Sequence, residues 1–218
     1  MKKTIAIIGA AGRMGTGLAR NFARAGHRIL LAGPHQSKLN ELLADIKART
    51  PNADVEILDC SHEASWEADL VIPAVPYSAQ AEVAAKIKDV VTGKIVISVA
   101  NPLNEAYDGL VTDAATSAAE ELARILPHSK VVKAFNTVFA AEFDSPSVGG
   151  RTVDCFVAGD DEEAVATVSA LVKDVGFNPL IAGKLLASRT LESMMVLLIG
   201  LTMKNSYNRL AGWKVLHQ

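Results

Sequence analysis

Three glycines near the amino terminus are spaced for a loop that binds phosphate. The stretch "IAIIGAAGRMG" places Gly9, Gly12 and Gly15 three residues apart, directly after an apolar run. In such a loop the first glycine permits a tight turn, the second lets the main chain approach a pyrophosphate, and the third lets helix and strand pack closely. The free N–H groups of the following helix favour the negative charge of phosphates. The pattern therefore predicts a dinucleotide site, the alternative being a glycine-rich turn without a ligand.

The loop after the second apolar run indicates which dinucleotide is bound. A carboxylate at this place would bind the ribose 2′-hydroxyl of NAD and repel the 2′-phosphate of NADP. The stretch "AGPHQSK" has no acid and offers Gly33, His35 and Lys38 instead. His35 and Lys38 can face a phosphate dianion, and Arg13 can reach it from the glycine loop. We therefore expect NADP, with Pro34 standing where an arginine would bind phosphate more strongly. The alternative is that His35 and Lys38 are solvated residues at the start of a helix.

Apolar runs alternate with helical patterns along nearly the whole chain. The pattern predicts strands over residues 4–10, 28–33, 54–59, 68–75, 93–100, 129–135, 154–159 and 178–183. It predicts helices over residues 13–25, 37–48, 78–90, 113–126, 162–175 and 185–210. Near-continuous apolar strands between helices are typical of a parallel sheet covered on both faces. The sequence thus predicts an α/β fold of the Rossmann type, doubly wound, with a mainly parallel sheet and a small C-terminal strand–helix extension.

The loop "DSPSVGG", residues 144–150, is the best candidate for a domain boundary. We expect residues 1–145 to form the dinucleotide-binding domain. We expect residues 146–218 to form a smaller extension packed on the same sheet.

Composition and charge exclude several classes of partner. The chain has 218 residues, half of them apolar, a formal net charge of −2 and no run of Lys and Arg, so we expect no nucleic-acid binding. The longest apolar stretch, residues 194–203, is short for a bilayer and closely follows Glu192, so we expect no membrane span. Cys60 and Cys155 lie far apart, which fits a reducing cytoplasm.

Five motifs together resemble one family in order and spacing. They are "GAAGRMGTGLA", "VIPAVPYSA", "VISVANPL", "VVKAFNT" and "VAGDDEEAVATVSALVKDVGFNPLIAG". The chain resembles the NADP-dependent deazaflavin reductases, which exchange hydride between NADP(H) and coenzyme F420, and is similar to the NADPH domain of the STEAP metalloreductases. The likeness covers nearly the whole chain. It implies NADP(H) as cofactor, coenzyme F420 or a flavin as a small-molecule ring acceptor, and a homodimer, with the C-terminal extension on the acceptor side and available for a dimer contact.

The resemblance also implies which residues form the site. The pyrophosphate would be lined by Gly9, Ala11, Gly12, Arg13 and Met14. The 2′-phosphate would be surrounded by Gly33, Pro34, His35 and Lys38. Three loops after strands would wall the nicotinamide and the acceptor: Ala74, Val75, Pro76 and Tyr77; Val99, Ala100, Asn101 and Pro102; Ala134, Phe135, Asn136 and Thr137. Asn136 and Thr137 are the candidate catalytic residues. Asn136 stands where deazaflavin enzymes have histidine, in the form that the STEAP proteins have.

Hydride transfer between two flat rings needs little acid–base chemistry from the protein. The protein supplies stacking, orientation and exclusion of water. Asn101 and Asn136 are candidates to hold a carboxamide or an acceptor carbonyl, and the alternative for each is a turn residue that bonds its own backbone. We therefore predict an NADPH-dependent oxidoreductase. The alternative, motivated by the absence of an acid–base residue set, is an NADP(H)-binding sensor or regulatory subunit without its own turnover.

Other chemistries fit the sequence poorly. A Tyr-x-x-x-Lys pair for alcohol oxidation is missing, and too little chain follows the sheet for a β-hydroxyacid dehydrogenase. Cys60 and His62 lie close together but lack a second pair of ligands, so we expect no metal site. The C-terminal apolar stripe, residues 191–203, is expected to be core or dimer surface. Trp213 either covers the acceptor or anchors the C-terminal tail.

Overall fold

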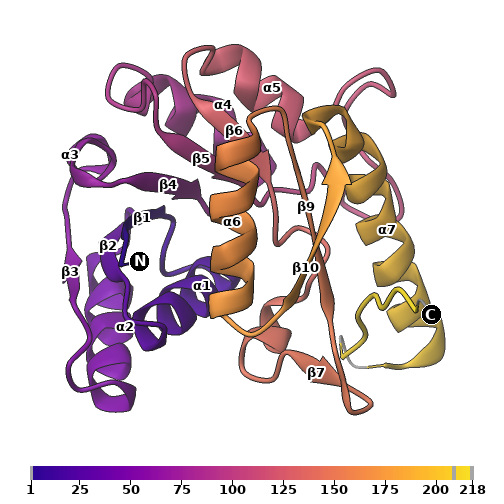
Figure 1. The fold of residues 1–218 in the computed structure, drawn as a ribbon, viewed down its shortest axis with the longest axis horizontal. Coiled ribbons are helices and arrows are strands. Elements are labelled where there is room, and N and C mark those ends of the chain that lie inside the picture. The colour runs from indigo at the N-terminus through magenta and orange to yellow at the C-terminus, as the bar shows by residue number, and fades with distance from the viewer. Residues whose placement is uncertain (1, 208–209, 217–218) are drawn as a thin grey trace.

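The computed structural model describes residues 2–207 and 210–216, and a sheet of eight strands lies at its centre (Figure 1). The strand order is β10-β9-β6-β5-β4-β1-β2-β3. Neighbouring strands pair in parallel except β6 and β9, which are antiparallel. The strands of this sheet are β1 (Thr4–Ile8), β2 (Arg28–Ala32), β3 (Val55–Ile57), β4 (Leu70–Pro73), β5 (Ile95–Ser98), β6 (Lys130–Lys133), β9 (Asp154–Gly159) and β10 (Asn178–Gly183).

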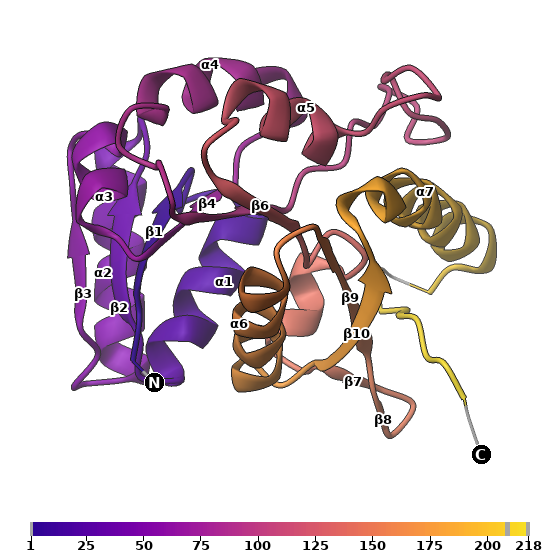
Figure 2. The same ribbon diagram turned by 45° about the horizontal axis from the view of Figure 1, so that its top comes forward.

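Helices cover both faces of the sheet (Figure 2). One apolar core lies under α1, α2 and α6, and a second lies under α3, α4 and α5. A smaller cluster joins Met195 and Leu198 of α7 to Phe139. The helices are α1 (Arg13–Arg24), α2 (Gln36–Arg49), α3 (Ser61–Glu67), α4 (Tyr77–Ile87), α5 (Ala118–Ile125), α6 (Glu162–Asp174) and α7 (Ser188–Asn205), with short 3₁₀ turns η1 (Ala140–Phe143) and η2 (Leu185–Ala187).

The strand order reverses beside β1. β1 pairs with β2 on one side and with β4 on the other, so the chain winds outward in both directions from this point. In open α/β sheets, ligands bind in the crevice outside the carboxyl ends of the strands at such a switch point. The predicted doubly wound, mainly parallel sheet of the Rossmann type is confirmed, and its switch point places the glycine loop at the head of the crevice.

Each predicted helix differs from the observed one by at least one residue at an end, and two of them differ by five residues. The helix predicted from residue 113 begins only at Ala118, because Ser117 caps it: the Ser117 hydroxyl accepts a hydrogen bond from the N–H of Glu120. The helix predicted over residues 185–210 ends at Asn205, where Ser206 adopts a left-handed φ of 55°. Residues 208 and 209 of that prediction lie outside the described residues. The short helix α3 had no prediction.

The predicted loop over residues 144–150 contains part of a small hairpin. β7 (Ser147–Val148) and β8 (Arg151–Thr152) pair in antiparallel fashion. Gly149 and Gly150 form the two-residue turn, and both have the positive φ that such a turn requires. After the hairpin, β9 joins the main sheet beside β6. The domain boundary at residue 145 stays a prediction.

The stretch Leu185–Asn205 has the length and apolarity of a membrane-crossing helix, because a window of 18 of its residues has a mean hydropathy of 1.4. In this fold the stretch lies beside the sheet, and 39% of that window is buried. Glu192 in its middle is wholly enclosed and paired with Lys133. These buried contacts make the stretch an integral element of the α/β fold.

Candidate functional site

The glycine loop makes a tight turn from β1 into α1. Gly9 has a φ of +82°, and a Cβ atom there would lie 2.6 Å from the main-chain O of Ala74. The N–H groups of Gly9 and Ala10 donate to the O of Ala32 at 2.8 and 3.2 Å. A Cβ atom on Gly15 would lie 2.5 Å from the O of Gly9, so α1 can approach β1 only because this residue has no side chain. Gly12 is the N-cap of α1.

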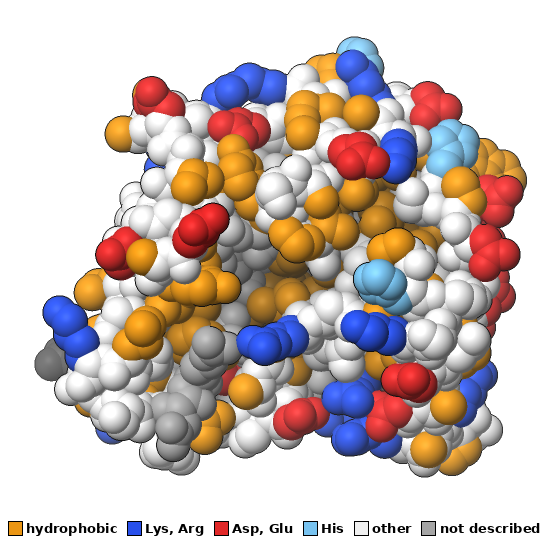
Figure 3. All heavy atoms as spheres, turned by 180° about the vertical axis from the view of Figure 1, so that it is seen from behind, with side chains coloured by type: hydrophobic (Ala, Val, Ile, Leu, Met, Phe, Trp, Pro, Cys, Tyr) orange, Lys and Arg blue, Asp and Glu red, His pale blue; other side chains and the backbone are white. Residues whose placement is uncertain are grey.

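A pocket of about 590 Å³ opens at this loop. Predicted site residues form much of its wall: Gly9, Ala11, Gly12, Gly33, Pro34, His35, Lys38, Ala74, Val75 and Pro76. The rest of the wall is Ile8, Asp59, Ser61, Ala79, Glu82, Val83 and Lys86. Seen from behind, the molecule has a hollow lined by hydrophobic side chains, with His, Lys and Arg side chains near it (Figure 3).

Three helices begin at the wall of this pocket. Their N-caps are Gly12 for α1, His35 for α2 and Pro76 for α4, and all three residues line the pocket. In the part of the chain that the structure describes, none of these N-caps makes a side-chain hydrogen bond, and none of the three first turns has an acid. By contrast, α5 and α6 have side-chain caps, Ser117 and Asp161, and glutamates in their first turns. Open helix N-termini favour anions, so the pocket suits a ligand with several phosphate groups.

The edge of the pocket next to β2 offers positive charge. Gly33 follows β2 directly, His35 caps α2, and the exposed Lys38 lies in the first turn of α2. A Cβ atom on Gly33 would approach its nearest neighbour, Cα of Gly9, no closer than 3.7 Å, so the site has room for a side chain but has none. In an NAD site an acidic side chain would occupy this position. Here the position is open and can take a phosphate group.

Sequence reasoning missed several pocket residues. Asp59 and Ser61 follow β3, the strand next to β2, and the missed signal was that neighbouring parallel strands end at the same edge. Glu82 and Lys86 reach the pocket from α4, where Nζ of Lys86 lies 2.6 Å from Oε1 of Glu82. Their spacing of four residues on one helix face was the available signal.

Asn101 and Asn136 meet across the loops that follow β5 and β6. Nδ2 of Asn136 donates to Oδ1 of Asn101 at 2.9 Å and to the O of Leu191 at 3.0 Å. Nδ2 of Asn101 donates to the O of Asn136 at 2.8 Å. Phe135, with a left-handed φ of 62°, turns the chain so that Asn136 faces this partner. Asn136 is fully buried, and its Oδ1 has no hydrogen-bond partner among the described residues.

The other predicted residues lie outside the pocket wall. Arg13 is exposed at the start of α1, and Met14 is partly buried and packs against the apolar core. The acceptor-side positions Val99, Ala100, Pro102, Ala134, Phe135 and Thr137 are buried. The structure thus gathers most of the predicted phosphate-side residues, together with the 74–76 stretch, at one pocket, while Arg13 and Met14 lie outside its wall. The residues after β5 and β6 form a separate, largely buried group.

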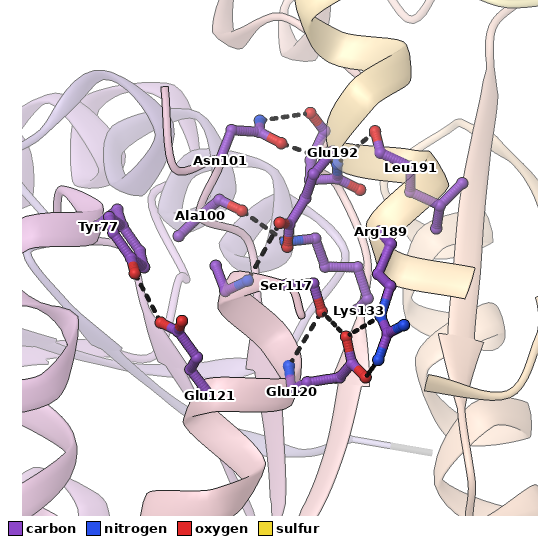
Figure 4. Close-up of polar contacts among 12 residues, drawn as sticks. Tyr77, Ala100, Asn101, Ser117, Glu120, Glu121, Lys133, Arg189, Leu191 and Glu192 are labelled. Atoms are coloured by element: carbon purple, nitrogen blue, oxygen red, sulfur yellow. Dashed lines mark hydrogen bonds and ion pairs between the residues drawn. The ribbon is translucent and has the colours of Figure 1, made fainter. Parts of the chain in front are cut away.

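Tyr77 points away from the pocket toward α5. Its hydroxyl donates to Oε2 of Glu121 at 2.6 Å (Figure 4). Burial, followed by this hydrogen bond to Glu121, raises the pKa of Tyr77 to about 12. The phenol therefore stays protonated and joins α4 to α5.

A buried ion pair lies beneath the acceptor-side loops. Nζ of Lys133 lies 2.5 Å from Oε1 of Glu192, and neither side chain is exposed to solvent. Burial lowers the pKa of Lys133, while Glu192 opposes that shift. Sequence reasoning missed this pair, although a lysine inside the apolar run "VVKAF" was a signal of a buried charge.

Two remaining candidates have structural partners. His62 lies 2.9 Å from Asp89 through Nε2 and Oδ2, and residues 2–207 and 210–216 hold no group of three metal ligands. The O of Trp213 accepts a hydrogen bond from the N of Asp154 at 2.9 Å. Nζ of Lys214 and N of Val215 also bind the Asp154 carboxylate, so the segment around Trp213 is anchored on β9.

Comparison with known proteins finds relatives in one family of reductases. The model of the family described as "NADP oxidoreductase coenzyme F420-dependent" matches residues 4–102. The F420-dependent NADP reductase of Methanocaldococcus jannaschii is 34% identical over 214 residues, which cover 92% of each chain. The metalloreductase STEAP3 of Rattus norvegicus is 35% identical over 114 residues, 52% of this chain and 22% of that protein. A crystal structure from Arthrobacter sp. FB24, described as an F420-dependent NADP-reductase, is 25% identical, with a TM-score of 0.84 over 99% of this chain and 100% of that one.

Proposed function

The chain belongs to the family of coenzyme F420-dependent NADP oxidoreductases, and from that membership we propose that it transfers hydride between NADPH and coenzyme F420. It is an NADP-dependent oxidoreductase. The observation that carries the proposal is the pocket at the switch point of the sheet, into which three uncapped helix N-termini open. The identity of the acceptor and the roles of single residues are the proposed part.

The pocket fits the phosphates of NADPH. We assign the pyrophosphate to the glycine loop and the start of α1, where Gly12 presents main chain without a side chain. The 2′-phosphate is assigned to Gly33, His35 and Lys38 with the start of α2. The stretch 74–76 after β4 then leads the cofactor toward its nicotinamide end. The lack of any acid directly after β2 supports NADPH over NADH.

The loops after β5 and β6 are assigned to the reacting rings. Asn136 Oδ1 and Thr137 Oγ1 both lack hydrogen-bond partners among the residues that the structure describes. A buried polar atom without a partner is costly, so these two oxygens are suited to accept an N–H of a carboxamide or ring. Asn101 orients Asn136 and completes this wall. The acceptor-side loops have to open slightly to admit a ring, because Asn136 is fully buried.

The reaction needs orientation more than proton transfer from the protein. NADPH supplies the hydride and becomes NADP+. The oxidised deazaflavin takes up that hydride together with one proton, which water can provide, and becomes the reduced deazaflavin. The buried apolar residues of the acceptor-side loops exclude water from the hydride path. A flavin has the same flat shape, so it is the competing acceptor that the experiment must include.

The test is anaerobic oxidation of NADPH followed at the nicotinamide band. Parallel reactions contain coenzyme F420, FMN, or no acceptor, and each is repeated with NADH. We expect kcat/KM to be at least about tenfold higher with F420 than with FMN, and with NADPH than with NADH. Turnover with FMN alone would reassign the enzyme to flavin reduction. Protein that binds NADPH but turns over neither acceptor would contradict the proposal.

We also propose that the enzyme is a cytoplasmic homodimer whose contact includes α7. Leu197, Leu201 and Met203 of α7 are exposed by 54, 39 and 68%, an apolar surface that a second copy could cover. Light scattering on the purified protein should give twice the chain mass of 23.1 kDa. A mass of 23.1 kDa at micromolar concentration would contradict the dimer and leave the reaction proposal untouched.

A further inference from the structure

Two opposite charges are enclosed where β6 meets α7. Lys133, the last residue of β6, and Glu192 of α7 have no solvent-exposed side-chain surface. Removing two charges from water is costly, and a hydrophobic pair of similar size often stabilises a fold as well or better. Stability alone therefore does not account for this pair.

Each charge also binds the main chain at one end of the same segment, residues 101–117. Nζ of Lys133 donates to the O of Ala100 at 2.5 Å. The N of Ala118 donates to Oε2 of Glu192 at 3.1 Å. Ala100 directly precedes the 101–117 segment and Ala118 directly follows it, so one ion pair holds both ends. Figure 4 shows these contacts converging between α5, β6 and α7.

The same turn of α7 holds the asparagine pair. Leu191, next to Glu192, accepts a hydrogen bond from Asn136 through its main-chain O at 3.0 Å. Asn136 is bonded in turn to Asn101, the first residue of the 101–117 segment. One turn of helix thus fixes the base of the segment and the orientation of both site asparagines.

A second ion pair fastens this turn of α7 to α5. Arg189 donates to both carboxylate oxygens of Glu120, at 2.8 Å from Nε and 2.6 Å from Nη2. Ser117 also donates to Glu120, at 2.8 Å. The Arg189–Glu120 pair is partly exposed, whereas the Lys133–Glu192 pair is fully buried. An exposed ion pair contributes little, so the Lys133–Glu192 pair is the one that sets how the 101–117 segment and α7 lie relative to each other.

We propose that Lys133 and Glu192 are positioning residues for hydride transfer, which fix the 101–117 segment and the asparagine pair relative to the cofactor pocket. This inference rests on the proposed function. It predicts that the pair acts on the acceptor step and leaves NADPH binding alone, because neither residue lines the phosphate-side pocket. Hydride transfer is sensitive to placement, since a displacement of about 1 Å can cost about 100-fold in rate.

The test compares the double variant Lys133→Met/Glu192→Leu with the wild type. The double variant has no unpaired buried charge, but it leaves the O of Ala100 and the N of Ala118 without these partners. Its Tm should therefore fall, but by less than the Tm of either single variant, which leaves a charge buried without its partner. Its kcat/KM for F420 should fall about 10- to 100-fold while its Kd for NADPH changes by less than about twofold. Hydrogen exchange in residues 99–103 and 134–138 should become faster. The surface pair Lys2–Asp54, whose atoms Nζ and Oδ2 lie 2.8 Å apart, supplies the control variant Lys2→Met/Asp54→Leu, which should match the wild type in kcat/KM and in exchange.

A purely structural pair would give a different result. The double variant would then recover both Tm and kcat/KM, and exchange in the two loops would match the wild type, which would overturn the proposal. If the double variant fails to fold, Glu192→Gln keeps the volume and takes over the test, with the same split expected between acceptor turnover and NADPH binding. The inference would be overturned if acceptor turnover and NADPH binding fell together, each by the fraction of the protein that is unfolded.

The inference and the proposed function fail in different ways. A wild type that binds NADPH but does not reduce F420 contradicts the proposed function alone. In that case the exchange of residues 99–103 and 134–138 still tests the positioning role, because it needs no acceptor. Unchanged exchange in a folded double variant rejects the positioning role whether or not the wild type reduces F420.

Discussion

Asn101 and Asn136 orient each other across the ends of two neighbouring strands. The side-chain amide of Asn136 donates to Oδ1 of Asn101 at 2.9 Å, and the amide of Asn101 donates to the O of Asn136 at 2.8 Å. β5 and β6 are parallel neighbours, so their carboxyl ends bring the two loops together. The two amides are therefore fixed by a contact between the two loops. An asparagine that only stabilised its own turn would bond its own backbone and would not make such a contact.

Replacing Asn136 with alanine should separate turnover from cofactor binding. The change leaves Oδ1 of Asn101 and O of Leu191 without this donor, so we expect a loss of about 1–3 kcal/mol in unfolding free energy. We expect kcat with F420 to fall about 10- to 100-fold while the Kd for NADPH stays within about twofold. Steady-state kinetics and NADPH fluorescence titration measure the two. The exposed Asn52→Ala is the matched control, and an Asn136→Ala enzyme with wild-type kcat would remove Asn136 from the site.

Replacing Gly33 with aspartate should change the cofactor preference. The new Cβ atom has room, its nearest neighbour lying 3.7 Å away, and the new carboxylate would repel a 2′-phosphate beside Lys38. We expect the ratio of kcat/KM for NADPH over NADH to fall at least about 10-fold. Gly33→Ala adds the Cβ atom without the charge and should keep the preference. A Gly33→Asp enzyme with an unchanged ratio would show that the 2′-phosphate binds elsewhere.

Gly15 and Gly200 should respond in opposite ways to alanine. A Cβ atom on Gly15 would lie 2.5 Å from the O of Gly9, so α1 would have to move away from the glycine loop. We expect a loss of about 1–3 kcal/mol in unfolding free energy and weaker NADPH binding. Gly200 lies inside α7 and its Cβ atom would meet nothing within 4 Å among the described residues, so Gly200→Ala should gain about 0.5–1 kcal/mol. Urea unfolding measures both, and equal behaviour of the two variants would contradict the close packing at Gly15.

The stability of the fold should fall as the pH rises from 5 to 8 because of Glu142. Burial raises the pKa of this carboxyl from 4.5 to about 7. Between these values the unfolded chain releases the proton and the folded chain keeps it, so the unfolding free energy decreases with pH and levels off above about 7. The loss is at most about 3 kcal/mol, from about 1.4 kcal/mol per pKa unit.

Glu142→Gln tests this pH dependence. The variant should lose less unfolding free energy between pH 5 and pH 8 than the wild type, because its side chain does not titrate. The exposed Glu105→Gln should keep the wild-type dependence. Parallel pH curves for wild type and Glu142→Gln in urea unfolding would rule out Glu142 as the source.

Local pattern and spacing were enough to predict the architecture. The glycine spacing and the alternation of apolar runs with helical patterns depend on residues close in sequence, and the sheet follows from them. Gly9 and Gly33 line the pocket, and the binding of phosphate there stays a prediction. Helix ends were harder to predict from the sequence. The start of α5, for example, depends on a single capping residue, Ser117.

The buried polar contacts could not be predicted in the same way. Lys133 and Glu192 lie 59 residues apart, and apolar periodicity does not reveal that two charges share one buried position. The polar residues Asp59 and Glu82 line the pocket. Their place there follows only from the positions of β3 beside β2 and of α4 after β4, which the sequence around each residue does not reveal. Such contacts depend on the three-dimensional arrangement of distant elements.

Direct transfer of a labelled hydrogen tests the central claim most directly. The enzyme is supplied, without oxygen and in ordinary water, with NADPH deuterated at C4 on one face and then on the other, and the reduced F420 is analysed by mass spectrometry. If the pocket holds NADPH against the acceptor as proposed, one of the two labelled cofactors should deliver about one deuterium per F420 reduced, and the other should deliver almost none. Reduced F420 without deuterium from either cofactor, or no reduced F420 at all, would contradict hydride transfer between NADPH and F420 in this enzyme.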